Sequence, residues 1–307
     1  MNPKKLLALA VPLLLAPTVL MGANVAEVLR KAEAADKHVS YRGTKTATVC
    51  FDGRSATATL KVIHLKPDKT RTQYFAPTAL AGIIVIQDGI DFWKYSPREH
   101  AWEPIRQPCP QQGGICHQAA LENFDLKLIG DDRVAGRPTY VLYAVPRHRG
   151  ESAHRLWVDR DCFLIIATQV EASNGAVVSS SRYDHVEINP PDISPSLFKV
   201  SGKVSAPSCG AGSARFVVVK PSYLPSGYRL VGRSCLTING ASSSHLQFTN
   251  GANTISLFQR REQKDAPPAK VASKVTNVLT WARSGMRFTL MGDVPRTELQ
   301  KIADSVR

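Results

Sequence analysis

The sequence has 307 residues, of which 43% are hydrophobic and 21% are charged. This composition excludes a disordered chain, a collagen-like chain and a membrane protein with many spans. Lys and Arg number 39 against 25 Asp and Glu, which gives a net charge of +14 and raises the question of an acidic partner. The length suits about two domains of ordinary size.

The first 23 residues are predicted to be an export signal. Lys4 and Lys5 precede an apolar run from Leu6 to Ala23, which ends in small residues. This pattern is typical of a cleaved signal peptide. An uncleaved N-terminal anchor is the alternative, because Met21 fits the small-residue rule for cleavage poorly. We therefore expect an exported protein.

The six cysteines form an even set without a CxxC pair, which in an exported chain favours disulfides over zinc or redox chemistry. Cys109 and Cys116 bracket a loop rich in Gln and Gly, and Cys209 and Cys235 flank one predicted strand. We favour these two pairs, with Cys50 and Cys162 left by elimination. Many other connectivities are open. A zinc site at Cys109 and Cys116 lacks a fourth ligand nearby.

A short helix followed by many strands is predicted for the first part of the mature chain. Asn24 can cap a helix over 25–37, whose apolar residues fall on one face. Period-two alternation and a high content of Thr, Val, Ile and aromatic residues predict strands at 41–50, 55–65, 69–76, 82–96, 138–146, 154–160, 163–171 and 176–187. Asp88-Gly89 and Asn174-Gly175 predict tight hairpins. A second short helix is expected at 118–124.

Composition marks a connecting segment over residues 191–213, which is rich in Pro and Gly. We expect Phe198, a large aromatic residue in this segment, to dock back on the first domain, which spans 24–190. A second domain is predicted over 214–307. It contains strands at FVVVKP (216–221), YRLVGRSC (228–235) and RFTLMG (287–292), an Asn250-Gly251 hairpin, and a terminal helix that starts near Pro295.

The positive charge is concentrated in the second domain. Residues 203–307 contain 15 Lys and Arg against 5 Asp and Glu, whereas residues 24–202 contain 22 against 20. Nucleic acid is not expected as a partner, because the chain is exported and its aromatic residues do not interleave with basic ones. An anionic membrane surface or an acidic segment of another protein fits this charge. The basic candidates for partner binding are Arg260, Arg261, Lys264, Arg283 and Arg287.

No catalytic motif is found. The sequence has no Gly-rich phosphate loop, nucleophile elbow or HExxH. His148, Glu151 and His154 lie in RHRGESAHR, which we interpret as a solvated, basic turn rather than a metal or acid–base site. The Asp pairs at 131–132 and 159/161 sit beside predicted turns, where Asp serves backbone hydrogen bonding. We therefore predict no catalytic residue, metal or cofactor.

Large apolar residues gather on neighbouring predicted strands of the first domain. A plain β-core is the simplest interpretation of most of them. A strongly curved sheet that closes over one helix would instead leave a cavity or groove suited to an acyl chain. The candidate ligand-binding residues are Ile84, Ile86, Phe92, Trp93, Tyr95 and Trp157.

The order of several motifs carries further information. SYRGT (40–44), IQDGIDFWKYSP (86–97), VAGRPTYVLYAVPR (134–147) and the Phe198 tail are followed by PSYLPSGYRL (221–230), QFTNGANTISLFQ (247–259) and the C-terminal stretch 281–306. In this order they resemble the RseB/MucB family, periplasmic regulators of the anti-sigma factor in the sigma-E envelope-stress system. The resemblance covers most of the mature chain. The six cysteines and RHRGESAHR depart from the family pattern.

The resemblance implies an α+β fold: a LolA-like curved antiparallel half-barrel with a helix, followed by a smaller α/β C-terminal domain without catalytic residues. It also implies a periplasmic regulator that binds the periplasmic segment of an anti-sigma factor and protects it from proteolysis. Lipid or envelope-stress sensing would belong to the N-terminal domain. The alternative is a periplasmic carrier of lipids or lipoproteins, because the N-terminal domain is similar to LolA and LolB.

Overall fold

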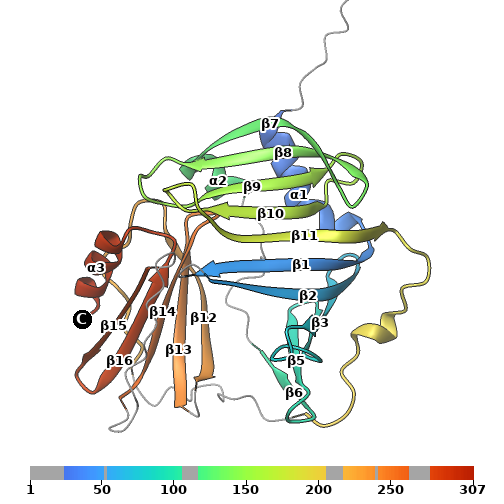
Figure 1. The fold of residues 1–307 in the computed structure, drawn as a ribbon. Helices are drawn as coiled ribbons and strands as arrows, with labels where there is room; N and C mark the ends of the chain where they lie inside the picture. Colours follow the sequence, from blue (N-terminus) through green and yellow to red (C-terminus); the bar gives the residue numbers. More distant parts are fainter. Residues whose placement is uncertain (1–23, 52–53, 106–116, 205–216, 239–240, 263–276) are drawn as a thin grey trace, which may run out of the picture.

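The computed structural model describes residues 24–51, 54–105, 117–204, 217–238, 241–262 and 277–307, which form two antiparallel sheets and a few helices (Figure 1). The N-terminal sheet contains β1 (Tyr41–Phe51), β2 (Arg54–Leu65), β3 (Lys69–Ala76), β4 (Ile84–Asp88), β5 (Asp91–Ser96), β6 (Ala101–Pro104), β7 (Phe124–Val134), β8 (Arg137–Pro146), β9 (Ala153–Asp159), β10 (Ile165–Glu171) and β11 (Val177–Ile188). The C-terminal sheet contains β12 (Arg229–Ile238), β13 (Ala241–Thr249), β14 (Thr254–Arg261), β15 (Asn277–Arg283) and β16 (Met286–Gly292). The helices are α1 (Val25–His38), α2 (His117–Asn123), α3 (Arg296–Ser305) and the 3-10 helix η1 (Pro195–Phe198).

The N-terminal sheet consists of two meanders, β1 to β6 and β7 to β11, joined by the pairing of β1 with β11. The sheet is strongly curved, so that β3 to β6 turn away from the plane of β7 to β11 (Figure 1). The hairpins predicted at Asp88-Gly89 and Asn174-Gly175 are confirmed, because tight turns join β4 to β5 and β10 to β11. Glycine provides the positive φ of both turns.

Helix α1 covers one face of the N-terminal sheet, which we call the helix face. Asn24 caps the helix by accepting a hydrogen bond from Ala26 N at 2.9 Å. The apolar stripe of Val28, Leu29 and Ala32 packs in one cluster with Leu142 and Leu156 of the sheet. The helix predicted from this stripe is therefore confirmed.

The segment after β11 covers part of the opposite face, which we call the linker face. Phe198 is 1% exposed and packs in one cluster with Ile63, Ile86 and Trp102. The indole Nε1 of Trp102 donates to Ser201 O at 2.9 Å, and its backbone N–H donates to Lys203 O at 2.9 Å. The predicted docking of Phe198 on the first domain is confirmed.

The C-terminal domain packs α3 on one face of its sheet. Leu299, Ile302 and Ala303 of α3 are buried in one cluster with Leu257 and Leu290. The terminal helix is thus confirmed, but the strand expected at 216–221 is wrong where the structure describes it. Residues 217–220 lie outside any strand. The backbone N–H and C=O of Val219 hydrogen-bond with the side-chain amide of Gln259 and not with a neighbouring strand.

The expected fold class, a curved antiparallel half-barrel with a helix followed by a smaller α/β domain, is confirmed. None of the helices in the described ranges has the length and apolar character required to cross a bilayer. The export signal expected at 1–23 lies outside the described residues.

The pairing of Cys50 with Cys162 is wrong, because both are free thiols. Cys162 lies near Val39 and Asn189, at the beginning of β1, whereas Cys50 lies near the end of that strand. The length of β1 separates them by roughly 30 Å, far beyond the reach of a disulfide. Cys235 is disulfide-bonded. Its predicted partner Cys209, like the predicted pair at 109 and 116, lies outside the described residues.

Candidate functional site

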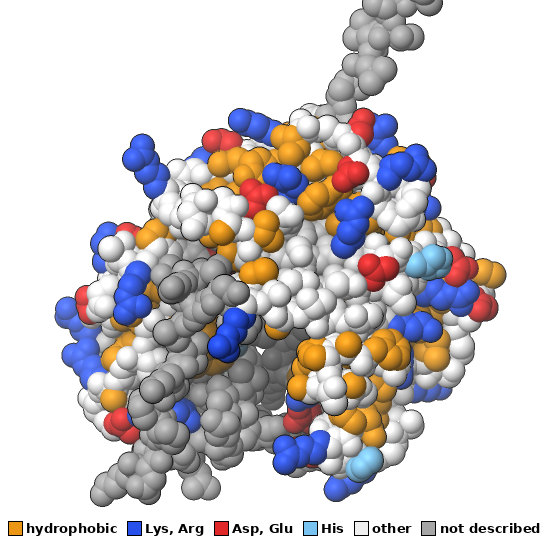
Figure 2. All heavy atoms as spheres, viewed as in Figure 1, with side chains coloured by type: hydrophobic (Ala, Val, Ile, Leu, Met, Phe, Trp, Pro, Cys, Tyr) orange, Lys and Arg blue, Asp and Glu red, His pale blue; other side chains and the backbone are white. Residues whose placement is uncertain are grey.

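A hollow lies between the two domains. Figure 2 shows it between the part of the N-terminal sheet formed by β3 to β6 and the C-terminal domain. The segment that includes η1 packs on the linker face of β3 and β4, so the helix face of these strands is turned toward the hollow. The curvature of the sheet thus leaves the helix face of these strands beside the hollow.

The six apolar candidates do not share one surface, because adjacent residues of a strand point to opposite faces. Phe92 lies on the helix face, whereas Ile84, Ile86, Trp93 and Tyr95 lie on the linker face, in the cluster around Phe198. Ile86 is completely buried there. These four residues therefore form packed core beneath the linker rather than the lining of one open groove.

Trp157 of β9 is also on the linker face, because its neighbours Leu156 and Val158 pack with α1 on the helix face. Its indole Nε1 donates to Asp132 Oδ2 at 2.8 Å. The carboxylate of Asp132 also accepts from Arg133 N at 2.6 Å, and these hydrogen bonds lower its pKa. As expected, Asp132 and Asp159 serve the backbone of neighbouring turns.

The basic candidates of the C-terminal domain are divided between two faces of its sheet. Arg260 of β14 lies directly opposite Arg287 of β16, on the face away from α3. Arg261 and Arg283 both lie opposite Met286, on the face that α3 covers. Arg283 donates to Val306 O at 3.0 Å and thereby fastens the C-terminus. Lys264 lies outside the described residues.

The helix face also carries a basic residue that the sequence interpretation missed. Lys45 of β1 follows Tyr41 and Gly43 in the alternation of inward-pointing residues, and its Nζ lies 5.3 Å from the centroid of the Tyr183 ring. Burial lowers the pKa of Lys45, and the charge of Asp36 opposes this effect. The sequence could have indicated this residue, because a lysine falls among the strand positions whose side chains point inward. Its ammonium group suits a carboxylate or phosphate.

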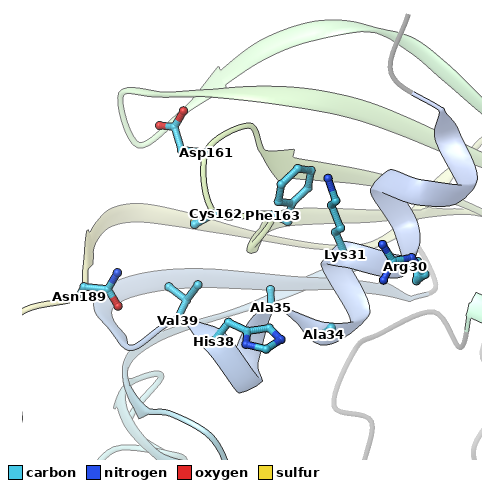
Figure 3. A pocket seen from close by; sticks show the side chains of 10 residues that line it. All are labelled: Arg30, Lys31, Ala34, Ala35, His38, Val39, Asp161, Cys162, Phe163 and Asn189. Carbon is cyan, nitrogen blue, oxygen red and sulfur yellow. The ribbon is translucent and has the colours of Figure 1, made fainter.

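A separate pocket of about 530 Å³ lies between α1, from Arg30 to His38, and the β9–β10 turn (Figure 3). Arg30, Lys31 and His38 line it from the helix, and Phe163 lines it from the turn. Lys31 Nζ lies 4.7 Å from the Phe163 ring centroid. The pocket combines apolar walls with three basic groups and one carboxylate, that of Asp161, and the excess of basic groups suits an amphipathic anion.

Cys162 also lines this pocket but is a poor nucleophile. Burial and the neighbouring carboxylate of Asp159 raise the pKa of the thiol to about 11, so it stays protonated at neutral pH. Elsewhere in the part of the chain that the structure describes, no three His, Cys, Asp or Glu side chains gather closely enough to hold a metal ion.

The interpretation of RHRGESAHR as a solvated turn is wrong for two of its residues. Glu151 is 4% exposed, and the His154 ring contacts the C-terminal domain through Asn253 Oδ1, 2.8 Å from its Nε2. The sequence shows polar residues in a loop, and only the second domain buries them. These residues build the junction between the domains.

Comparison with known proteins identifies relatives along the whole described chain. The sigma factor AlgU regulatory protein MucB of Pseudomonas aeruginosa is 25% identical over 199 residues, which span 60% of this chain and 60% of that relative. The match thus covers less than two thirds of the relative's length. A crystal structure of MucB in complex with MucA(peri) superposes with a TM-score of 0.67 at 19% identity, covering 92% of this chain and 98% of MucB.

Two further structures have the same fold. The complex of Pseudomonas aeruginosa MucA/MucB has a TM-score of 0.67 at 20% identity, covering 93% of this chain and 99% of the other. A crystal structure of MucB has a TM-score of 0.68 at 18% identity, covering 94% and 98%. The family model of the MucB/RseB N-terminal domain matches residues 24–202, and that of the MucB/RseB C-terminal domain matches residues 216–307. The chain therefore belongs to the MucB/RseB family.

Proposed function

We propose that this protein is a periplasmic, non-enzymatic regulator that binds the periplasmic segment of an anti-sigma factor and protects it from proteolysis. The observation that carries the proposal is the match of both domains, in order, to the MucB/RseB family. The relative MucB is named as a regulator of the sigma factor AlgU, and its structures include complexes with MucA. The hollow between the domains gives such a segment a surface to bind.

The second domain supplies positive charge for this contact. Arg260 and Arg287 lie opposite each other on adjacent strands, so two like charges are held on one surface. Such an arrangement repels other cations and attracts an acidic segment. Arg287 forms an ion pair of 3.5 Å with Glu262, whereas Arg260 is the better residue to test because its replacement leaves that pair in place.

Binding is tested by calorimetric titration of the full chain with the periplasmic segment of the anti-sigma factor from the same genome. We expect a complex that weakens as salt increases, and a further loss of affinity of roughly tenfold for Arg260→Glu. Arg260 lies on the face of the sheet away from the α3 core, so we expect the fold to be retained. Arg54→Glu, an exposed reversal in the N-terminal sheet, is the matched control. Absence of any complex would overturn the proposal.

Protection from proteolysis is tested on the same complex. The anti-sigma segment is digested by a periplasmic protease with and without one equivalent of this protein. We expect the anti-sigma segment to stay intact when the wild-type protein is present. With Arg260→Glu at elevated salt, we expect the segment to be cleaved at the rate seen without the protein. If the protein binds the segment but does not slow its cleavage, the protective part of the proposal is wrong and only the binding part stands.

A second candidate function, lipid binding, is favoured by the pocket between α1 and the β9–β10 turn. Its apolar walls suit part of an acyl chain, and Arg30, Lys31 and His38 suit an anionic head group. Native mass spectrometry of protein purified from its own envelope should then show a bound acyl species. Arg30→Glu should abolish it, whereas Arg98→Glu, on an exposed turn of the same sheet, should not.

A further inference from the structure

The junction between the two domains is formed by the β13–β14 turn of the C-terminal domain and the β8–β9 loop of the N-terminal domain. Asn250 and Asn253 of the turn are completely buried. Asn250 Nδ2 donates to Glu151 Oε2 at 2.8 Å, and Asn253 Nδ2 donates to the same oxygen at 3.3 Å. Asn253 Nδ2 also donates to Ser152 O at 3.1 Å. A single carboxyl group therefore receives two side chains from the opposite domain.

Close backbone contacts fix the position of the turn. Gly251 has a φ of +111°, and a Cβ at this position would lie 2.7 Å from the backbone of Ala119 and Ala120 in α2. Asn123 at the end of α2 donates to Asn250 O at 2.9 Å. On the other side of the loop, a Cβ on Gly150 would lie 2.2 Å from Pro295 Cγ. The turn is thus seated between α2 and the β8–β9 loop, with its backbone close to that of α2.

Two acidic groups also act on Glu151. From the C-terminal domain, the charges of Asp293 after β16 and Glu298 of α3 act on it, and both raise its pKa. Tyr228 at the entry to β12 is buried near the same acids, and its hydroxyl lacks a hydrogen-bond partner within the described part of the chain. His154, at the beginning of β9, interacts electrostatically with Asp293. Loss of solvent has the largest effect and outweighs the hydrogen bonds from Asn253 and Asn250, which lower the pKa, so the pKa of Glu151 rises to about 7.

We propose that this junction is a proton-controlled latch, in which protonated Glu151 keeps the domains docked and ionised Glu151 loosens the β13–β14 turn. A neutral carboxyl can still accept from Asn250 and Asn253 through its carbonyl oxygen. An ionised carboxyl at the same place is a buried charge beside two other acids. Deprotonation therefore acts on the contact that joins the domains, while each domain keeps its own core.

The direction of the pH dependence follows from the raised pKa. The docked state holds the proton of Glu151 more tightly than the undocked state, where the carboxyl is solvated and has an ordinary pKa near 4.5. Docking is therefore strongest below that value and weakens as pH rises through about 7. Burial raises the pKa of Asp293 and lowers that of His154. These two shifts act in opposite directions on the proton uptake that accompanies docking.

Hydrogen–deuterium exchange of the full chain without any partner tests the latch. We expect the protection of residues 249–253, corrected for the intrinsic exchange rate, to fall by up to about tenfold per pH unit between pH 5.5 and 7 and then to level off. Glu151→Gln, which mimics the protonated side chain, should remove this dependence. Glu99→Gln, an exposed turn residue far from the junction, should keep the wild-type profile.

Two results would overturn the latch. One is a flat profile in the wild-type chain, and the other is an unchanged slope in Glu151→Gln. Should the variant fail to fold, NMR titration of the wild-type carboxyl carbons decides instead, because Glu151 must titrate near pH 7 and not with the exposed glutamates. Since no anti-sigma segment is present, failure here leaves the proposed function intact, and loss of partner binding leaves the latch intact.

Discussion

The side-chain amide of Gln259 hydrogen-bonds both backbone groups of Val219. Its Nε2 donates to Val219 O at 2.7 Å, and its Oε1 accepts from Val219 N at 2.9 Å. Gln259 is completely buried on the face of β14 that α3 covers. The side chain of Gln259 therefore makes the hydrogen bonds that a neighbouring strand would make, and it holds the segment before β12 against the core.

Replacement of Gln259 by Leu should destabilise the C-terminal domain. Both backbone groups of Val219 would lose their partner, at a cost of about 1–3 kcal/mol each, partly offset by the apolar side chain. We expect a loss of about 2–4 kcal/mol in the free energy of unfolding, measured by urea denaturation. Gln247→Leu on the opposite face of the neighbouring strand should change stability by less than about 1 kcal/mol. Equal effects would contradict the role of the amide.

Replacement of Phe198 by Ala should release the linker from the first domain. Phe198 is 1% exposed, and truncation of a buried Phe costs about 3–5 kcal/mol. We expect lower stability and faster proteolytic cleavage within 190–204. Its neighbour Leu197 is 37% exposed, so Leu197→Ala is a matched control that should leave both nearly unchanged. An equal rate of cleavage in the two variants would show that Phe198 does not anchor the linker.

His245 should make the C-terminal domain less stable in acid. Its ring stacks on Phe258 with the centroids 4.3 Å apart, and burial lowers its pKa to about 4. The unfolded chain binds a proton at this residue near pH 6.5, so stability is complete above that pH and is lost as pH falls toward 4. After allowance for partial exposure we expect a loss of about 1–2 kcal/mol.

Denaturation of His245→Phe at several pH values checks this expectation. The variant keeps a ring to stack on Phe258 but has no titrating nitrogen, so its stability should vary less between pH 4 and 6.5. His100→Phe, on an exposed turn, is the control and should retain the wild-type dependence. A wild-type slope in the His245 variant would assign the acid sensitivity to other groups.

The cysteines should react differently with alkylating reagents. Mass spectrometry of unreduced protein after alkylation under denaturing conditions should find Cys50 and Cys162 modified and Cys235 in a disulfide. In the native state Cys162 should react slowly at neutral pH, because its thiol has a pKa of about 11. Rapid native alkylation of Cys162 would contradict the buried, protonated thiol.

Local signals in the sequence were sufficient for most of the fold. The dipeptides Asp88-Gly89 and Asn174-Gly175 require positive φ, so their hairpins depend on residues next to one another. Successive side chains of a strand point to opposite faces, so Phe92 and Trp93 had to lie on opposite faces of the sheet. This was evidence in the sequence against a common apolar groove. A run such as Val217–Val219 gives the same strand signal whether a strand or a side chain completes its hydrogen bonds.

The junction could not be predicted in this way. Glu151 and Asn250 are 99 residues apart in sequence, and each looks like an ordinary turn residue. Their burial arises only when the two domains meet. The cysteine prediction failed for a related reason, because the elimination that paired Cys50 with Cys162 ignored the length of the strand between their positions. Non-local geometry thus decided both outcomes.

The docked linker also sets the length of the tether between the domains. Trp102 holds the chain through Lys203, so only residues 205–216 join that anchor to the described start of the second domain. A stretch of this length spans at most roughly 40 Å, so an undocked C-terminal domain stays close to its own binding site. A short connection keeps the effective concentration of one domain near the other on the order of millimolar. Few contacts are then needed for docking, and a change at one carboxyl group can alter its equilibrium.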